Sequence, residues 1–230
     1  MLALLHHVFD FFYPNLCLVC EREQPLPDRS VCVACQVKLP KTGFHQDRDN
    51  AFEQRFWNRQ RIVAGTSMYY FFKGSSTQAL IHKLKYKGQR VIGYQLGKLY
   101  GYDLKESREF ADVEVIVPVP LHPMKERRRG YNQSDCFAEG LSESMGIPWL
   151  KGGLKRVHNN SSQTRKSQLG RFEDTLNNFR VNQPKALQDK HVLLVDDVLT
   201  TGATLEACAQ HLLELPNTRV SMATIAIAQH

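Results

Sequence analysis

His191-Val-Leu-Leu-Val-Asp-Asp-Val-Leu-Thr-Thr-Gly-Ala-Thr204 is the stretch of sequence that decides the fold. Its apolar run, Val192 to Val195, predicts a short strand that is buried on both faces. Two carboxylates, Asp196 and Asp197, follow at the C-terminal end of this strand. A turn then opens an apolar-periodic helix near Leu205. Because open α/β sheets bind ligands at the carboxyl ends of their strands, we expect a binding site here.

The turn between the strand and the helix has the chemistry of a phosphate site. Small hydroxyl side chains and a glycine let backbone N–H groups and the helix dipole surround an anion. The residues of this turn are Thr200, Thr201, Gly202, Ala203 and Thr204. The sequence here lacks the Gly-Lys-Ser/Thr of a Walker loop and the Gly-x-Gly-x-x-Gly of a dinucleotide fold. An ordinary buried strand with a capped helix does not explain why the acid pair and the hydroxyl-rich turn occur together.

This combination resembles the phosphoribosyl pyrophosphate (PRPP) loop of the type I phosphoribosyltransferases. The resemblance implies that Thr200–Thr204 holds the 5′-phosphate of PRPP and that Asp196 and Asp197 contact the ribose hydroxyls. It also implies the fold of that family, an open and mainly parallel α/β sheet with flanking helices and a hood. Mg²⁺ would accompany PRPP, bound mainly by PRPP oxygens and water. Whether either aspartate also acts as a catalytic base is left open.

Composition is that of an ordinary globular protein with an excess of positive charge. The chain has 230 residues, of which 42% are hydrophobic and 23% charged, and its formal net charge is +7. This length allows one sizeable core and a small accessory module. The charge favours polyanionic partners, either phosphorylated metabolites or nucleic acid, and does not choose between them.

The first residues of the chain, Met1 to Phe12, are apolar without the features of a signal peptide or a membrane span. No basic segment precedes them, Asp10 interrupts the run, and it is shorter than the roughly 18 residues of a membrane span. One helical face carries Leu2, Leu5, Phe9 and Phe12. We favour a helix docked on the core over a helix on a membrane surface. The expected location is the cytoplasm, and we do not expect an integral membrane protein.

Four cysteines form two C-x-x-C pairs near the N-terminus. The pairs are Cys17 with Cys20 and Cys32 with Cys35. Two such pairs can place four thiolates around Zn²⁺ in a tetrahedron, which predicts a structural zinc site. Two disulfides or a vacant thiol cluster are the alternatives, and disulfides would need an oxidising compartment. The remaining cysteines, Cys136 and Cys208, lie in helical patterns, and we expect them to pack in the core.

The middle of the chain begins with a polar, aperiodic segment. Residues 46–61 read as a linker, and Ile62 to Phe72 predicts a strand or hairpin from its β-branched and aromatic residues. Helices are predicted from Thr77 to Leu84 and from Ile92 to Ser107. A last strand is predicted from Arg219 to Ala228.

A basic run follows the first of these helices. It consists of Lys83, Lys85, Lys87 and Arg90, with Tyr86 between the lysines. Such a run is often only a solvated surface. Because an aromatic residue is interleaved with the cations and the whole chain is basic, we also consider it a candidate surface for single-stranded DNA.

A second basic segment follows the strand predicted at Val113 to Leu121. Its cations lie in a predicted loop that ends at the helix Ser134 to Met145; they are Lys125, Arg127, Arg128 and Arg129. This arrangement suits a multiply charged anion such as pyrophosphate. We assign Lys125, Arg129 and Gly130 to that anion, since glycine allows a close backbone approach. A solubilising surface loop is the alternative.

A more specific resemblance then emerges from several motifs together. Pro118-Val-Pro-Leu-His-Pro and Arg129-Gly-Tyr-Asn-Gln133, with the four N-terminal cysteines and the PRPP loop, resemble the ComF (GntX-like) family. The resemblance runs from Cys17 to the end of the chain and implies a protein linked to competence and the use of external DNA. It includes a middle segment whose matching residues are Gln163, Thr164, Leu169, Arg171 and Phe179. Asp174 stands where the family pattern leads us to expect asparagine. By the same resemblance, Lys155 to Arg171 corresponds to a hood over the PRPP site, against the alternative of an inert loop.

We therefore expect three regions: 1–45 with the N-terminal helix and zinc module, a linker at 46–61, and a phosphoribosyltransferase-like domain at 62–230. The first functional hypothesis is a ComF-type protein that binds PRPP with Mg²⁺ and single-stranded DNA and supports DNA uptake with other DNA-uptake proteins. The second is an active phosphoribosyltransferase with an unidentified nitrogen acceptor. The third is a non-catalytic scaffold whose zinc module docks a partner. No motif identifies the acceptor, the oligomeric state or a partner.

Overall fold

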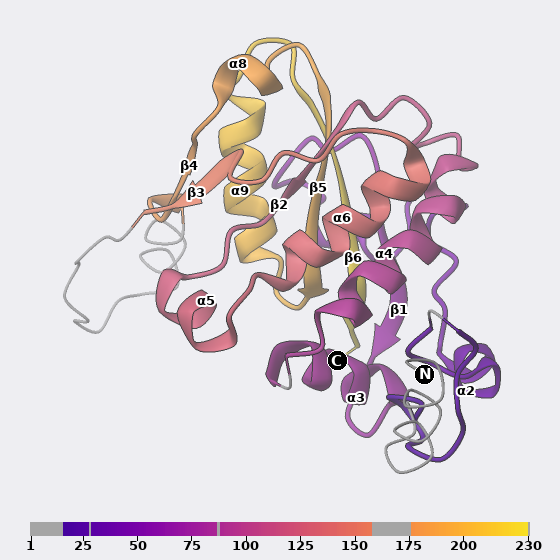
Figure 1. Cartoon of the computed structure of the whole chain (residues 1–230). Coiled ribbons are helices and arrows are strands. Elements are labelled where there is room, and N and C mark those ends of the chain that lie inside the picture. The colour runs from indigo at the N-terminus through magenta and orange to yellow at the C-terminus, as the bar shows by residue number, and fades with distance from the viewer. Residues whose placement is uncertain (1–15, 28, 87, 158–175, 230) are drawn as a thin grey trace.

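The computed structural model describes residues 16–27, 29–86, 88–157 and 176–229 (Figure 1). Helices and strands alternate along the chain, as an α/β fold requires. In chain order the elements are α2 (Val33–Lys38), the 3-10 helix η1 (Glu53–Arg55), β1 (Gly65–Phe71), α3 (Ser76–Tyr86), α4 (Arg90–Lys105), β2 (Val115–Pro118), α5 (Pro123–Arg129), α6 (Gln133–Met145), β3 (Leu154–Arg156), β4 (Phe179–Val181), α8 (Pro184–Leu187), β5 (His191–Leu199), α9 (Ala203–Leu213) and β6 (Arg219–Ala228).

The main sheet is parallel, and β5 is one of its two inner strands. Its strand order is β1-β6-β5-β2, and each neighbouring pair is parallel. The predicted strand at Val192 to Val195 forms the buried first half of β5. Val195 pairs with Pro118 of β2 on one side and with Ala223 of β6 on the other. The predicted fold class, an α/β fold with a parallel sheet, is confirmed.

Alternate side chains of β5 enter two separate hydrophobic cores, one on each face of the sheet. Leu193 and Val195 belong to the core that includes residues of α3, α4 and α6. Val192 and Leu194 belong to the core that includes residues of α9, β4 and α8. Figure 1 shows α6 and α9 on opposite sides of the sheet. Coverage of both faces explains why residues 192–195 of β5 form an uninterrupted apolar run.

Two glycines let α4 and α6 approach closely. A Cβ on Gly97 would lie 2.2 Å from the carbonyl oxygen of Phe137, and one on Gly140 would lie 2.0 Å from the carbonyl oxygen of Tyr94. Backbone therefore meets backbone at both positions, where a side chain would separate the helices. This contact matters for the site because α6 carries Ser134 to the end of β5.

The four-cysteine module rests on α3 and α4. The backbone N–H of Ser30 donates to Oε1 of Gln95 at 2.7 Å, and Nζ of Lys83 lies 2.6 Å from Oε1 of Glu21. A mostly apolar and aromatic cavity of about 560 Å³ lies between the module and α4. The module is thus attached to the helical layer of the larger domain.

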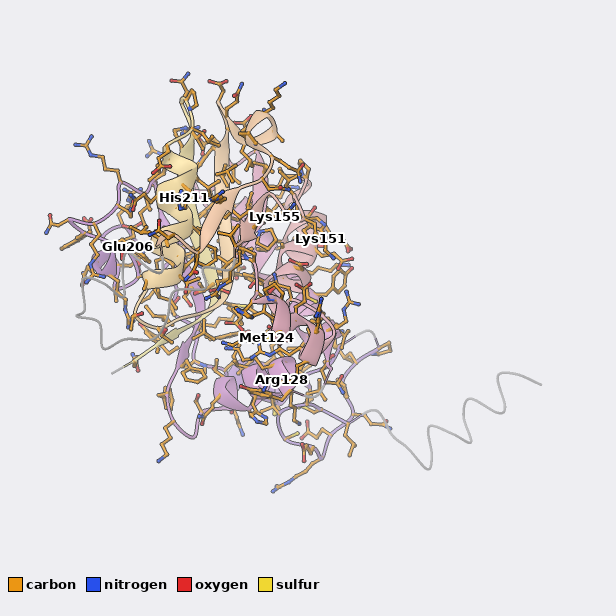
Figure 2. The ribbon with its side chains drawn as sticks, turned by 90° about the vertical axis from the view of Figure 1, so that its left-hand side faces the viewer. Met124, Arg128, Lys151, Lys155, Glu206 and His211 are labelled. Carbon is orange, nitrogen blue, oxygen red and sulfur yellow. The ribbon has the colours of Figure 1, made fainter. Side chains whose placement is uncertain are left out.

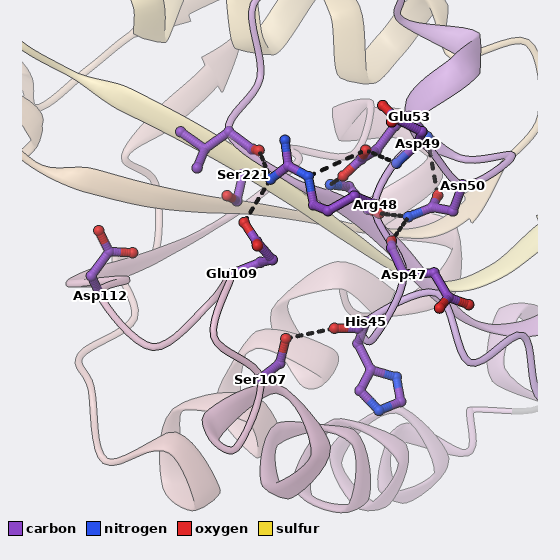
Figure 3. A network of polar contacts seen from close by, with 12 residues as sticks. His45, Asp47, Arg48, Asp49, Asn50, Glu53, Ser107, Glu109, Asp112 and Ser221 are labelled. Carbon is purple, nitrogen blue, oxygen red and sulfur yellow. Dashed lines mark hydrogen bonds and ion pairs between the residues drawn. The ribbon is translucent and has the colours of Figure 1, made fainter.

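Residues 46–61 are folded against the domain that follows them. Phe52 and Phe56 are fully buried in the same core as α9. Asn50 donates to the carbonyl oxygen of Gly65 at 3.0 Å, and the carboxylate of Glu53 accepts from the N–H of Gly65 at 3.0 Å. Figure 3 shows this network together with Arg48, which bonds to Glu109 at 2.6 Å. The polar residues that suggested a linker bind the start of β1, while the domain boundaries themselves stay predictions.

Three expectations concern residues outside the described part of the chain. The amphipathic helix near the N-terminus falls in residues 1–15, Lys87 of the basic run is not described, and most of the predicted hood falls in residues 158–175. The departure at Asp174 also lies there. Among the helices that are described, none has the length and hydropathy needed to cross a bilayer.

Candidate functional site

The two aspartates lie in the C-terminal half of β5, which continues past them to Leu199, whereas the sequence predicts that the strand ends before them. Oδ1 of Asp196 accepts a hydrogen bond from Oγ of Ser134 at 2.8 Å and another from the backbone N–H of Asp197 at 2.8 Å. Burial and the neighbouring charge of Asp197 raise the pKa of Asp196 to about 7, although its hydrogen bonds and Lys85 act in the opposite direction. The Asp196 carboxyl group therefore changes between its protonated and ionised forms near neutral pH.

Asp197 forms an ion pair with a lysine that the sequence places in a different site. Nζ of Lys85 lies 3.0 Å from Oδ2 of Asp197, and both side chains are largely shielded from solvent. Lys85 is in the last turn of α3 and belongs to the basic run predicted as a DNA-binding surface. The structure places its ammonium group at the acid pair.

The predicted phosphate loop forms a small hollow at the start of α9. Gly202 is the N-cap of this helix and has a φ of 87°, a left-handed conformation that glycine adopts without strain. The hollow has a volume of about 40 Å³ and is lined by Asp196 and by residues 198–205. Thr200 and Thr201 are exposed, and Ala203 and Thr204 are partly exposed. A helix N-terminus beside a carboxylate pair offers one place for a phosphate and one for sugar hydroxyls.

The cations predicted in a pyrophosphate loop lie on a helix, so the prediction of a loop at this position is wrong. Pro123 occupies the first turn of α5, and Nδ1 of His122 accepts from the N–H of Met124 at 3.2 Å. Gly130 ends the helix with a φ of 80°. Proline at the start and glycine at the end are the usual limits of a helix, and they enclose the basic residues here. Lys125 is exposed on this helix.

Arg129 points back toward the end of α3. Its guanidinium lies 5.2 Å from the centre of the Tyr86 ring, and its Nη1 donates to Oε1 of Gln133 at 2.7 Å. Nε of Arg129 and Nε2 of Gln133 are buried and have no hydrogen-bond partner among the described residues. An anion or a water molecule bound beside them would satisfy these donors.

The remaining members of the first basic run have separate roles. Lys83 is buried and pairs with Glu21 of the four-cysteine module. The guanidinium of Arg90 lies over the ring of Tyr131, 5.6 Å from its centre. Together with the Lys85 pair, these contacts place the described members of the run in three different environments. They do not form one continuous patch.

A different surface gathers exposed cations. Figure 2 shows Met124 and Arg128 of α5 on the same face of the molecule as Lys151 and Lys155. Lys125, Arg127, Arg128, Lys151 and Lys155 are all exposed. Nζ of Lys151 lies 3.5 Å from Asp135, a pair too exposed on the lysine side to hold that charge firmly. We call Arg128, Lys151 and Lys155, which share the face in Figure 2, the α5–β3 basic face.

The four cysteines at the N-terminus come together as predicted. The Sγ atoms of Cys17, Cys20, Cys32 and Cys35 all lie within 4.8 Å of one another, and the cysteines are free thiols. Sγ of Cys17 accepts from the N–H of Cys32 at 3.3 Å and of Val19 at 3.4 Å, which is how zinc knuckles orient their thiolates. The donor set and its spread fit structural Zn²⁺. Cys136 and Cys208 are buried elsewhere, as expected.

Sequence reasoning missed two contributors to the site. Ser134 holds Asp196, and its only signal is its position after Arg129-Gly-Tyr-Asn-Gln133 at the start of a helix. Arg55 donates to the carbonyl oxygen of Thr200 in the phosphate loop from a segment that read as a linker. No pattern in the sequence indicates that contact.

Comparison with known proteins gives consistent matches along the chain. Residues 134–230 match the family described as phosphoribosyl transferase domain. DNA utilization protein YhgH of Salmonella typhimurium is 34% identical over 214 residues, which cover 87% of this chain and 91% of the relative. YhgH of Escherichia coli K12 is 30% identical, covering 86% and 84%, and Competence protein F of Haemophilus influenzae is 29% identical, covering 89% and 93%.

Proposed function

The chain belongs to the ComF/YhgH family of competence proteins with a phosphoribosyltransferase domain, and from this membership we propose that it binds PRPP with Mg²⁺ and single-stranded DNA in support of DNA uptake. The single observation that carries the PRPP part is the hollow that Asp196 shares with the turn at residues 198–205. A phosphate site and a hydroxyl-binding carboxylate thus adjoin each other, as a phosphorylated sugar requires.

Each part of PRPP has a matching group in this site. The N-terminal turn of α9 receives the 5′-phosphate through backbone N–H groups and the hydroxyls of Thr200, Thr201 and Thr204. Asp196 and Asp197 accept hydrogen bonds from the ribose hydroxyls. Arg129, with its unpartnered Nε, and Lys125 attract the pyrophosphate, and Gly130 leaves room beside it. Mg²⁺ would neutralise the pyrophosphate charge, held mainly by PRPP oxygens and water, with the aspartates as the nearby carboxylates.

The α5–β3 basic face supports the DNA part of the proposal. Its cations are exposed and lie on the face that Figure 2 presents. Lysine and arginine along a surface neutralise phosphates and release counterions, so binding of this kind weakens steeply as salt increases. This face replaces the run from Lys83 to Arg90 as the preferred DNA surface, because Lys83 and Lys85 already have carboxylate partners. Other proteins of DNA uptake are the proposed partners in the cell.

One observation favours catalysis as a second candidate function. A carboxylate whose pKa lies near 7 can take a proton from an attacking nitrogen at neutral pH. Asp196 meets this condition beside the proposed ribose position. The protein would then transfer ribose 5-phosphate from PRPP to a nitrogen acceptor, with release of pyrophosphate.

Calorimetry tests the first proposal directly. PRPP with Mg²⁺ is titrated into the wild type and into Asp197→Asn, and we expect micromolar binding that the variant weakens by about tenfold or more. In parallel, fluorescence anisotropy with a single-stranded oligonucleotide is measured between 50 and 200 mM salt (roughly the range over which phosphate contacts separate from others). Equal PRPP affinity in both proteins would remove Asp197 from the site, and DNA affinity that does not change with salt would refute the electrostatic surface.

A separate assay addresses catalysis. Release of pyrophosphate from PRPP is followed with nucleobases and amines as acceptors. Turnover that Asp196→Asn abolishes would establish the second function. Protein that responds to neither PRPP nor DNA would favour a scaffold role for the four-cysteine module.

A further inference from the structure

Arg55 connects the segment before β1 to the phosphate loop. It is the last residue of η1, and its guanidinium donates through Nη1 to the carbonyl oxygen of Thr200 and through Nη2 to the carbonyl oxygen of Ala228. The first acceptor belongs to the turn that opens α9, and the second ends β6. A cation is therefore held against the backbone of the predicted phosphate loop.

The charge of Arg55 has no carboxylate partner among the described residues. Both of its hydrogen-bond acceptors are neutral carbonyl oxygens, and partial burial lowers its pKa without any acidic group acting against this. Arg59, four residues later in the chain, provides the contrast. Its Nη1 lies 3.5 Å from the carboxylate of Glu206, so part of its charge is offset. Of these two arginines, Arg55 therefore adds the larger net positive charge to the loop.

The packing of η1 fixes Arg55 in place. Phe56, the next residue, is buried, and the nearest atoms to a Cβ placed on Gly202 would be those of its ring, at 3.2 Å. Phe52 is buried in the same core, 5.6 Å from Phe56 between ring centres. The carboxylate of Glu53 binds the N–H groups of Asp49 and Gly65. An arginine anchored in this way loses little conformational entropy when an anion binds nearby.

We propose that Arg55 is an anion-binding residue of the phosphate loop and selects a phosphate monoester at Thr200–Thr204. Two of its five N–H donors are used by carbonyl groups, which leaves its charge and its other donors to attract a dianion that binds at the loop. The proposal rests on the proposed PRPP site and adds a residue from outside the matched domain at residues 134–230. It also predicts that ribose 5-phosphate, which has the ribose and the 5′-phosphate of PRPP and lacks the pyrophosphate, uses the same residue.

The test compares two substitutions at Arg55 with a matched control. Arg55→Gln keeps amide N–H donors and removes the positive charge. Arg55→Lys keeps the positive charge and loses the paired N–H donors of the guanidinium group. Arg59→Gln is the control, because it changes the neighbouring arginine that pairs with Glu206. Ribose 5-phosphate, PRPP with Mg²⁺, and pyrophosphate with Mg²⁺ are titrated into each protein by calorimetry, with thermal unfolding recorded as a check on folding.

We expect Arg55→Gln to weaken ribose 5-phosphate and PRPP by about tenfold and to leave pyrophosphate affinity within about twofold. Arg55→Lys should stay within about threefold of the wild type, and so should Arg59→Gln. Folded Arg55→Gln protein with wild-type affinity for ribose 5-phosphate would overturn the proposal. Equal losses in Arg55→Gln and Arg55→Lys would also overturn it, since the charge would then be irrelevant.

The two proposals fail in different ways. Wild-type protein that binds ribose 5-phosphate through Arg55 but not PRPP would retain the role of Arg55 and refute the PRPP site. If the wild type binds PRPP and Arg55→Gln binds it with the same affinity, the PRPP site is retained and the role of Arg55 is refuted. Protein that binds none of the three anions would refute both.

Discussion

Nζ of Lys85 lies 3.0 Å from Oδ2 of Asp197, so the end of α3 and the end of β5 meet in an ion pair. Asp197 is also the carboxylate that the sequence assigns to the ribose hydroxyls. A bound sugar must therefore share Asp197 with Lys85 or displace it.

Removal of Lys85 should shift the pH dependence of PRPP binding. The positive charge of Lys85 lowers the pKa of Asp196, which is about 7 in its presence. In Lys85→Met we expect this pKa to be higher, so that the gain in PRPP affinity that accompanies loss of the Asp196 proton occurs at higher pH. Calorimetry between about pH 5 and 9 (roughly two units either side of the titration) measures the pH of half-maximal change in PRPP affinity.

Two controls accompany that measurement. Asp196→Asn reports the part of the pH dependence that comes from the phosphates of PRPP. Lys83→Met removes a lysine of the same helix that pairs with Glu21 instead, and its midpoint should equal that of the wild type. A Lys85→Met midpoint at or below the wild-type value would contradict the ion-pair interpretation.

The stability of the protein should fall as the pH increases toward 7 because of Asp196. Its pKa in the folded state is about 7, well above the ordinary value of 3.8, so the folded state holds the proton more tightly than the unfolded state. The stabilising contribution is complete below the ordinary pKa and is lost as the pH passes through about 7. Urea unfolding of the wild type and of Asp196→Asn between pH 5.5 and 8 (roughly the window around that pKa) should show a wild-type decline that the variant lacks. Parallel curves would mean that Asp196 is ionised throughout.

Gly202→Ala should destabilise the phosphate loop by more than the conformational cost of placing an alanine in a left-handed backbone conformation. The φ of 87° costs about 1 kcal/mol for a residue with a Cβ, and the added atom would meet the Phe56 ring at 3.2 Å. We expect a loss of about 1–2 kcal/mol in the free energy of unfolding and weaker PRPP binding. Gly74→Ala is the matched control, because Gly74 has a φ of 82° and no described atom lies within 4 Å of the place its Cβ would take. Equal PRPP affinities in the two variants would show that Gly202 has no special part in binding.

Cys32→Ser should release zinc and destabilise the N-terminal module. Cys32 lies in the cluster of four thiols, and a structural zinc site with three thiolates binds the metal far more weakly. We expect zinc content, measured by mass spectrometry of the purified protein, to fall from about one ion per chain to a small fraction. Cys136→Ser changes a buried thiol outside the cluster and should keep its zinc. A folded Cys32→Ser module without metal would refute the structural role.

The main sheet was predictable because its strands are rich in apolar and β-branched residues. The alternation of β5 between two cores requires apolar residues at every position from Val192 to Val195, and that requirement is visible in the sequence. Proline and glycine at the limits of α5 were equally visible, yet the cluster of arginines favoured a loop there. Residues 46–61 were misleading for a different reason. Their buried aromatics are few and without period, and their polar residues bind backbone groups of β1.

The site was predictable only where its residues are adjacent in sequence. The acid pair and the phosphate loop form one stretch, and the four cysteines form a repeated spacing. Lys85, Ser134 and Arg55 reach the same place from three separate elements. Such convergence depends on tertiary packing, which a local pattern does not encode. The basic run from Lys83 to Arg90 illustrates the limit, since neighbouring cations in sequence have different partners in space.

The position of Phe52 and Phe56 in the core of α9 has a consequence for how this chain can be divided. A shortened protein that begins at residue 62 would retain every strand of the main sheet and would still expose the surface that these two rings cover. It would also lack Arg55. Excision, domain fusion or exchange with a relative should therefore place the junction before Thr42, whose N–H bonds to the carbonyl oxygen of Met68 in β1. In this family member, the shortest segment that can be transferred as a folded unit is therefore longer than the segment that contains the main sheet.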